Sequence, residues 1–403
     1  MRIIKIQAQL WPLQFFLLML SVFNVFVGYG IALPVLPFLL QDRYAGVVDF
    51  SVAWHTGMMT GVFMITLFLF APLWGKLSDR LGRRPVILIG LGGCVVALMA
   101  FALVETLWLG YFTRALGGAV VSAVLPVALA YVSDISSPEL RARRFAWISA
   151  AATLGFLVGP GVGGWINGSD LATNNVVDAT ALPFLLGSIA GLIIWIVVLF
   201  GLSESTSLSM QSLNKTDKQF LPVTAVNSLI FLAILGMFGL GSFEVSLALQ
   251  GQQLLNLTSF QIGMLFMVCS LMMVIVQVLL FSILAHTFSF RYIITTALLT
   301  MSAGLGLIPF AVGFNMVLFA TALVGIGSGV LIPLLAYQTS LNAGNVQGAA
   351  LGKQTAAGGL GQGLGSIMAG ALFGFASQTP FWFTAILLAG GALIGLRITR
   401  QPI

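Results

Sequence analysis

The chain contains a series of uninterrupted apolar runs, each about as long as a helix needs to cross a lipid bilayer. Such a helix takes roughly 20 residues, and residues 181–202, for example, include no charged side chain. Only 7% of the 403 residues are charged and 59% are hydrophobic, whereas a soluble domain carries about 25% charged residues. These values exclude a water-soluble enzyme, a disordered chain and a disulfide-rich secreted module. Continuous runs also exclude a β-barrel, whose strands are alternating segments of roughly ten residues.

The apolar runs predict an all-α membrane protein with twelve transmembrane helices. The expected spans are residues 12–39, 52–74, 85–104, 107–133, 144–166, 181–202, 223–249, 259–285, 292–312, 314–338, 347–376 and 379–397. One polar stretch divides them six and six. We therefore expect an N-terminal six-helix bundle over residues 1–202, a cytoplasmic linker over 203–222, and a C-terminal six-helix bundle over 223–403. The first run shows no small-residue cleavage site, so we interpret it as a retained helix rather than a signal peptide.

Lysine and arginine residues fix the expected orientation of the spans. If both termini are cytoplasmic, fifteen of the seventeen basic residues fall on the cytoplasmic side, which is the asymmetry of membrane proteins. Arg43 is then the only basic residue outside, and Arg114 lies within a span. The net charge of +6 is therefore an orientation signal, and we expect no nucleic-acid partner. The predicted location is the bacterial inner, or plasma, membrane.

Glycine positions repeat between the two halves. With an offset of 206 residues, Gly155, Gly159 and Gly164 correspond to Gly361, Gly365 and Gly370. Two similar six-helix halves that share a binding site near the middle of the membrane are a common transporter plan. Chance agreement between glycine-rich helices is the alternative. The repeat predicts two pseudo-symmetric bundles.

The loop after the second span reads Gly75-Lys-Leu-Ser-Asp79-Arg-Leu-Gly82-Arg83-Arg84. It resembles motif A of the major facilitator superfamily, G-x-L-x-D-R-x-G-R-R, at every position. Glycines allow a tight turn, and an aspartate can pair with arginines at the membrane edge. The resemblance implies the major facilitator fold. A solvated basic loop is the alternative, but it explains neither the aspartate nor the glycine spacing.

The fourth span ends at Asp134 and is followed by Pro138-Glu139-Leu-Arg141. This stretch is similar to the inner-gate acid and the P-E-x-R segment of the superfamily. We expect a cytoplasmic network that stabilises the outward-facing state and breaks when the cavity opens inward. Its predicted members are Asp79, Arg83, Arg84, Asp134, Glu139 and Arg141. Exposed pairs contribute about 1 kcal/mol or less, so only a partly buried network would bias the two states.

Two charged residues lie inside predicted spans. Arg114 begins an R-x-x-x-G sequence that resembles motif B of the superfamily, whose arginine is held to assist proton transfer or to balance charge. Glu244 is the only carboxylate within a span, and intramembrane carboxylates are usually functional. Burial favours its protonated form, which suits proton coupling. The alternatives are an arginine bonded to backbone carbonyls and an ordinary glutamate at the outer interface.

The fifth span resembles motif C of the antiporter branch, G-x-x-x-G-P-x-x-G-G, at every position. The matching residues are Gly155, Gly159, Pro160, Gly163 and Gly164. Glycines form a groove for a close helix neighbour, and the proline bends the helix. The resemblance implies a twelve-span drug:proton antiporter that exports its substrate. A general small-residue packing face is the alternative.

The first span also resembles the tetracycline-efflux proteins, and the similarity is clearest from residue 23 to residue 164. Those proteins carry an acid in the middle of this span, where this chain has Asn24. Tetracycline is therefore not assigned as a substrate.

Together these features predict a proton-coupled antiporter, not an enzyme, that exports a small lipophilic or amphiphilic solute by alternating access. An exporter or importer of a specific metabolite, such as a siderophore, is the alternative. The expected partners are the solute, protons and the lipid bilayer; we expect a monomer, with no metal and no cofactor. The polar and aromatic residues expected to line the cavity are Asn24, Tyr29, Tyr111, Gln277, Tyr337 and Gln338.

Overall fold

The structure is a computed structural model, and the part described here comprises residues 2–44, 51–136, 138–168, 179–205, 223–282, 290–342 and 347–397. Nearly all of these residues are helical, and none forms a strand. The helices of the first half are α1 (Arg2–Tyr44), α2 (Val52–Leu81), α3 (Arg83–Ala102), α4 (Leu107–Val121), α5 (Val124–Ile135), α6 (Pro138–Asn167) and α8 (Leu182–Gly201). Those of the second half are α9 (Val223–Gln253), α10 (Ser259–Ser282), α11 (Phe290–Leu307), the short 3-10 helix η2 (Ile308–Phe310), α12 (Phe314–Asn342), α13 (Gln347–Phe375) and α14 (Thr379–Arg397).

The helices have the lengths that the apolar runs predict. Among the described residues, eleven helical segments are long and apolar enough to cross a membrane, with α4 and α5 together counting as one. The glycine-rich α13 is also long enough, at 29 residues. The prediction of an all-α membrane protein is confirmed. Most of the predicted linker, residues 206–222, lies outside the described residues, so the domain boundaries stay a prediction.

The fourth predicted span is divided into α4 and α5 by a break at residues 122–123. Pro126 explains the break, because a proline has no amide hydrogen to donate to the carbonyl four residues earlier, here that of Ser122. At the break, the Ala123 N–H donates to the Val120 carbonyl at 3.2 Å, and the Ser122 hydroxyl donates to the Ala119 carbonyl at 2.7 Å. The single expected helix is therefore two shorter helices on one path.

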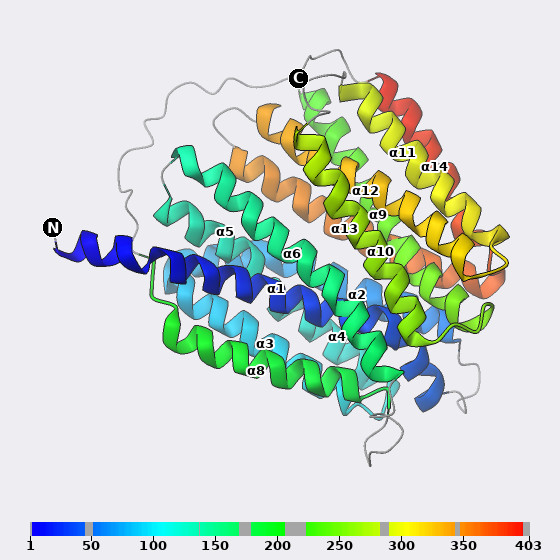
Figure 1. Ribbon diagram of the computed structural model, residues 1–403, viewed down its shortest axis with the longest axis horizontal. Helices are drawn as coiled ribbons and strands as arrows, with labels where there is room; N and C mark the ends of the chain where they lie inside the picture. Colours follow the sequence, from blue (N-terminus) through cyan, green and yellow to red (C-terminus); the bar gives the residue numbers. More distant parts are fainter. Residues whose placement is uncertain are drawn as a thin grey trace.

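Helices of each half pack mainly on one another, and two helix pairs form most of the contact between the halves. In the first half α1 lies against α6 and α8, and in the second α9 lies against α13. Across the halves, α2 packs on α13 and α6 packs on α10. Figure 1 shows the first-half helices in blue to green and the second-half helices in yellow-green to red.

We name the two ends of the bundle by their residues. The basic end carries Gln14, Arg83 and Arg144; the far end carries Arg43, Ser51 and Asn167. At the far end, a methyl group added to Gly57 of α2 would lie 2.6 Å from the Ser366 carbonyl oxygen of α13. One added to Gly263 of α10 would likewise meet the backbone of Pro160 in α6. Because the backbones of helices from different halves touch at these two places, the halves are packed closely together at the far end.

The close contacts between glycines and neighbouring helix backbones follow the internal repeat. Gly155 and Gly159 of α6 lie against the backbone of α1 at Phe23 and Val27, and Gly361 and Gly365 of α13 lie in the same way against α9. Across the halves, Gly164 lies on Ser259 of α10, and its counterpart Gly370 lies on Ala53 of α2. Residues 53 and 259 are themselves separated by the offset of 206. The two bundles are therefore pseudo-symmetric in their closest contacts as well as in sequence.

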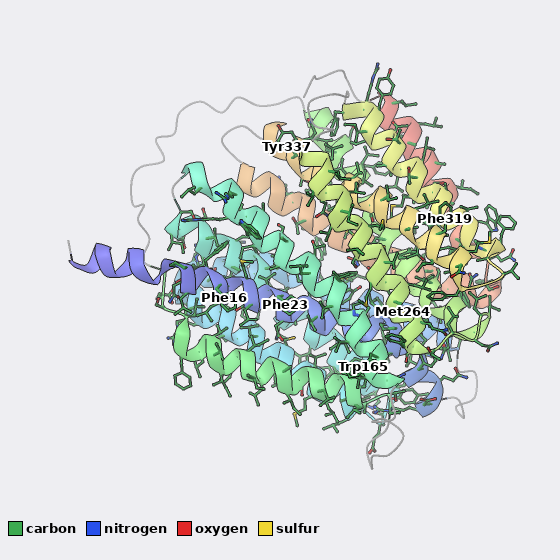
Figure 2. The ribbon with its side chains drawn as sticks, in the orientation of Figure 1. Phe16, Phe23, Trp165, Met264, Phe319 and Tyr337 are labelled. Carbon is green, nitrogen blue, oxygen red and sulfur yellow. The ribbon has the colours of Figure 1, made fainter. Side chains whose placement is uncertain are left out.

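Large apolar side chains cover the outer surface of the bundle. Figure 2 shows examples such as Phe16, Trp165 and Phe319, whose exposed fractions are all above one half. A soluble protein rarely exposes so continuous an apolar surface, whereas a lipid bilayer solvates it. This surface agrees with a membrane-embedded chain.

Candidate functional site

Glu244 of α9 lies at the interface between the two halves, with 1% of its surface exposed. Its carboxylate receives three hydrogen bonds from two side chains. The Tyr29 hydroxyl of α1 donates to Oε2 at 2.7 Å, and the Gln362 amide of α13 donates to Oε1 at 3.0 Å and to Oε2 at 3.1 Å. Both donors suit an ionised carboxylate, since an amide N–H cannot accept a proton and a hydroxyl readily donates to a negative oxygen.

The helix backbone explains why Gln362 reaches Glu244. Gly241 lies directly against the carbonyl of Gln362, and Gly365 lies against the backbone of Phe238. These glycines allow α9 and α13 to approach closely, as small residues do in membrane bundles. Glu244 follows Gly241 by three residues, so its side chain emerges beside that of Gln362.

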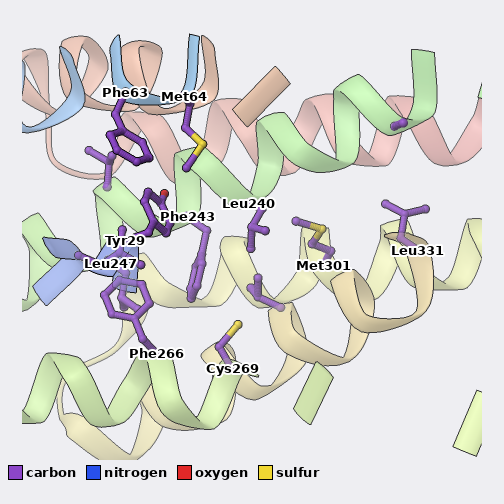
Figure 3. Packing of buried hydrophobic residues seen from close by; sticks show 14 of the residues in the cluster. Tyr29, Phe63, Met64, Leu240, Phe243, Leu247, Phe266, Cys269, Met301 and Leu331 are labelled. Carbon is purple, nitrogen blue, oxygen red and sulfur yellow. The ribbon is translucent and has the colours of Figure 1, made fainter. Parts of the chain in front are cut away.

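Tyr29 is held by aromatic rings on both sides. Its ring stacks on Phe63 of α2 and packs against Phe156 of α6, each at 5.5 Å between centroids. Figure 3 shows Tyr29 and Phe63 beside the second-half residues Phe243 and Phe266. The hydroxyl of Tyr29 is thereby directed across the interface, and its bond to Glu244 joins the two halves.

Arg114 of α4 lies near Tyr29, within the first half. It is 7% exposed, and its guanidinium carbon lies 4.1 Å from the ring centroid of Phe101 and 5.9 Å from that of Phe63. Within the part of the chain that the structure describes, its Nε and Nη2 have no hydrogen-bond partner and it forms no ion pair. Arg114 and Tyr29 both line a cavity of about 30 Å³, which is room for a water molecule. Tyr29 therefore interacts with both intramembrane charges, by a hydrogen bond with Glu244 and electrostatically with Arg114.

Two further polar contacts join the halves nearer the far end. The Gln252 amide of α9 donates to Gln41 of α1 at 2.8 Å. The Asn167 amide of α6 donates to the Ser259 hydroxyl of α10, also at 2.8 Å. Like the Tyr29–Glu244 bond, these contacts link helices that must separate if the far end opens.

The predicted inner-gate residues assemble at the basic end around Arg83. Its guanidinium bonds Asp79 at 2.5 Å, Asp134 at 2.9 Å and the Ser78 hydroxyl at 2.6 Å. Arg84 does not join this cluster, and its side chain donates to the Leu199 carbonyl at 2.7 Å. All of these residues belong to the first half. The side chains of Glu139 and Arg141 lie outside the described residues.

Glu204, which follows α8, is a member of this cluster that the sequence reasoning missed. Its Oε1 accepts the backbone N–H of Arg83 at 2.7 Å, and its carboxylate also accepts that of Arg84. Gly82 has a φ of 96°, which turns the chain sharply so that α3 begins facing Glu204. The side chain therefore caps the N-terminus of α3, where a negative charge is favourable. Its place at the start of a polar stretch gave no signal of this role.

The motif C residues of α6 face two neighbours. A methyl group at Gly159 would lie 2.6 Å from the Val27 carbonyl oxygen, and one at Gly163 would lie 2.8 Å from the backbone of Ile31, both in α1. Gly164 instead faces α10 of the other half, as does the carbonyl of Pro160. The motif thus forms one close contact inside a half and one between the halves.

The predicted cavity residues are scattered, and only Tyr29 joins the central cluster. Asn24 lies against Gly191 of α8, inside the first half, and Tyr111 accompanies His55 near the far end with 2.7 Å between its hydroxyl and Nδ1. Gln277 is half-buried, Gln338 is buried and Tyr337 is exposed, all three in the basic-end part of α10 and α12. Gln362 was missed, because it is one of three glutamines in the glycine-rich sequence of α13 and nothing in the sequence sets it apart.

A comparison with known protein families identifies the family to which this chain belongs. The family model described as Major Facilitator Superfamily matches residues 18–352 and, in a second match, residues 229–402. The chain belongs to the Major Facilitator Superfamily. The family prediction from motif A is thereby confirmed.

Relatives within the superfamily match over nearly the whole chain. Multidrug resistance protein 2 of Bacillus subtilis (strain 168) is 27% identical over 394 residues, which cover 96% of this chain and 94% of that protein. Quinolone resistance protein NorA of Staphylococcus aureus (strain Mu50 / ATCC 700699) is 26% identical over 387 residues, covering 94% and 95% respectively.

Solved structures share the superfamily fold at low sequence identity. A bacterial homologue of the human lysosomal transporter Spinster, in an inward-facing and occupied conformation, superposes with a TM-score of 0.77 at 12% identity, over 95% of this chain and 96% of that one. A D-xylose-proton symporter gives 0.75 at 16% identity, over 96% and 97%. At these identities the likeness shows the fold alone.

Proposed function

We propose that the protein is a proton-coupled antiporter that exports a small lipophilic or amphiphilic drug-like solute. The observation that carries the proposal is the buried Glu244, the only carboxylate in the interior of a described span, bonded across the interface between two halves. A carboxylate at this place can gain and lose one proton per cycle, and its bonds change when it does. The relatives named for multidrug and quinolone resistance support a drug-like solute over a siderophore.

In this proposal the basic end faces the cytoplasm of a bacterial cell and the protein acts as a monomer in the plasma membrane. Fifteen basic residues favour that orientation. The far end, which would face outward in this orientation, is closed by the contacts of α2 with α13 and of α6 with α10. Rocking of the halves would then expose the central cluster to the outside.

Transport in proteoliposomes tests the proposal. Purified protein is reconstituted, an acid-interior pH gradient is imposed, and uptake of a fluorescent quinolone is followed. The protein inserted with its basic end outward is expected to accumulate the drug only with the gradient, and Glu244→Gln is expected to abolish gradient-driven accumulation. Gln277→Leu, remote from the central cluster, is the matched control and should retain gradient dependence. Full gradient dependence in Glu244→Gln would contradict the proposal.

A further inference from the structure

The central cluster is asymmetric in one respect. Glu244 and Gln362 belong to the second half, and the two hydrogen bonds between them stay inside that half when the halves move. The Gln362 amide also donates a longer bond, of 3.4 Å, to the Tyr29 hydroxyl across the interface. The bond from Tyr29 is the only one of the cluster's contacts to Glu244 that crosses to the first half. Removing the Tyr29 hydroxyl therefore disconnects the halves at this point, whereas removing the Gln362 amide does not.

The strength of the crossing bond depends on the proton of Glu244. A hydrogen bond to an ionised carboxylate is roughly twice as strong as one between neutral groups. When Glu244 is protonated, the Tyr29 hydroxyl must accept that proton's hydrogen bond or share a neutral oxygen, and the bond becomes a neutral one. Gain of a proton by Glu244 thus weakens a tie between α1 and α9.

Among the groups around Glu244, Tyr29 is the one whose hydrogen bond to it crosses the interface and changes when Glu244 gains a proton. Besides Tyr29 from α1 and Gln362 from α13, Glu244 interacts electrostatically with the thiol of Cys269 in α10, which is buried. Arg114 of α4 interacts electrostatically with Tyr29. Neither Cys269 nor Arg114 forms an ion pair with Glu244 among the described residues.

We propose that the Tyr29 hydroxyl is a latch that keeps the far end closed while Glu244 is ionised and releases it when Glu244 is protonated or a substrate takes its place. Tyr29 is a positioning residue in this role. The proposal rests on the proposed function and deepens it. An antiporter must prevent the carrier from reorienting with neither proton nor solute, because that step dissipates the gradient. A latch that forms only when Glu244 is ionised and no solute is bound prevents this unloaded reorientation.

Accessibility of the far-end interface tests the latch. Ala53 is buried where α2 meets Gly370 of α13, and the two native cysteines are buried elsewhere. Protein carrying Ala53→Cys is reacted with a membrane-impermeant maleimide as a function of pH. The labelling rate is divided by that of a fully exposed cysteine at the same pH, because the thiolate is the reacting species and its population falls with pH. The latch predicts that this normalised labelling accelerates as pH falls, because protonated Glu244 releases the far end. Labelling that does not depend on pH would overturn it.

Tyr29→Phe, added to Ala53→Cys, keeps the ring on Phe63 and Phe156 and removes only the hydroxyl. The rate of labelling at high pH is expected to rise about tenfold, which is the effect of deleting one hydrogen bond to a charged group. The labelling rate should also lose its dependence on pH. Downhill drug flux without a pH gradient should rise in parallel. Gln362→Leu is the matched variant, since it also removes a donor to Glu244; it should move the midpoint of the pH dependence and keep the dependence itself.

The outcomes separate the latch from the antiport function. Unchanged labelling in Tyr29→Phe, together with lost gradient-driven transport in Glu244→Gln, would overturn the latch and leave the antiport function standing. Loss of pH dependence in Gln362→Leu as well as in Tyr29→Phe would also overturn it, because a variant that keeps the Tyr29–Glu244 bond would then have the same effect. Gradient-driven transport in Glu244→Gln would refute the antiport function, whatever Tyr29→Phe does.

Discussion

The basic end and the centre of the molecule use polar side chains in opposite ways. At the basic end, Arg83 holds Asp79 and Asp134, and Glu204 caps α3, all within the first half. At the centre, the Tyr29 hydroxyl reaches Glu244 in the other half. Interactions inside a half stiffen a body that moves as a unit, whereas interactions between halves must be exchanged in each cycle. Whether a contact affects stability or transport therefore depends on whether it lies inside one half or between the halves, and not on its strength.

Motif C offers the largest test of this distinction, because its glycines face both kinds of neighbour. Gly159→Val would place a side chain against the Val27 carbonyl and Gly30 of α1, inside the half, where no rocking motion relieves the overlap. Overpacking of this kind costs about 3 kcal/mol. We expect a markedly lower melting temperature in detergent.

Gly164→Val is the matched variant at the interface. Its side chain would overlap the backbone of Ser259 in α10, and opening of the far end removes that overlap. We expect near-normal melting but faster maleimide labelling of Ala53→Cys. Equal loss of melting temperature in the two variants would contradict the distinction between contacts inside a half and contacts between halves.

The sequence predicts the fold of this molecule better than it predicts the partners of its buried charges. Run lengths and motifs A and C lead to the fold, because crossing a bilayer demands about 20 apolar residues and close helix contact demands glycine. Glu244 stands out because a carboxylate is rare in such a sequence. Its partners could not be predicted: a helix in lipid is apolar on every face, so the sequence does not reveal how the helix is rotated. The prediction that Asn24 lines the cavity has this weakness, and its side chain lies beside Gly191 of α8.

Arg83 provides the second test, of intermediate size. Arg83→Met removes both ion pairs and the bond to Ser78, and since the arginine side chain is 16% exposed we expect a loss of about 2 kcal/mol in stability. Asp79→Asn should cost about 1 kcal/mol or less, because Asp79 is 63% exposed.

The pH dependence of far-end labelling distinguishes two roles for Arg83. A brace within the first half predicts that Arg83→Met lowers the melting temperature and leaves this pH dependence unchanged. The inner-gate hypothesis instead predicts altered labelling, because a gate that stabilises the outward-facing state shifts the populations of the two states when it breaks. The two measurements on one variant therefore decide between them.

The smallest test concerns Ser259, whose hydroxyl joins Asn167 and the Gly164 carbonyl across the far end. Ser259→Ala removes both bonds, and one net hydrogen bond contributes about 1 kcal/mol. Labelling of Ala53→Cys should rise about fivefold at every pH, since no titrating group takes part. Ser188→Ala is the control, because its hydroxyl bonds the Leu185 carbonyl inside α8. If Ser259→Ala changed the pH dependence itself, proton coupling would extend beyond Tyr29 and Glu244 to the far-end contacts. The latch would then be one of several cross-half bonds that respond to the proton.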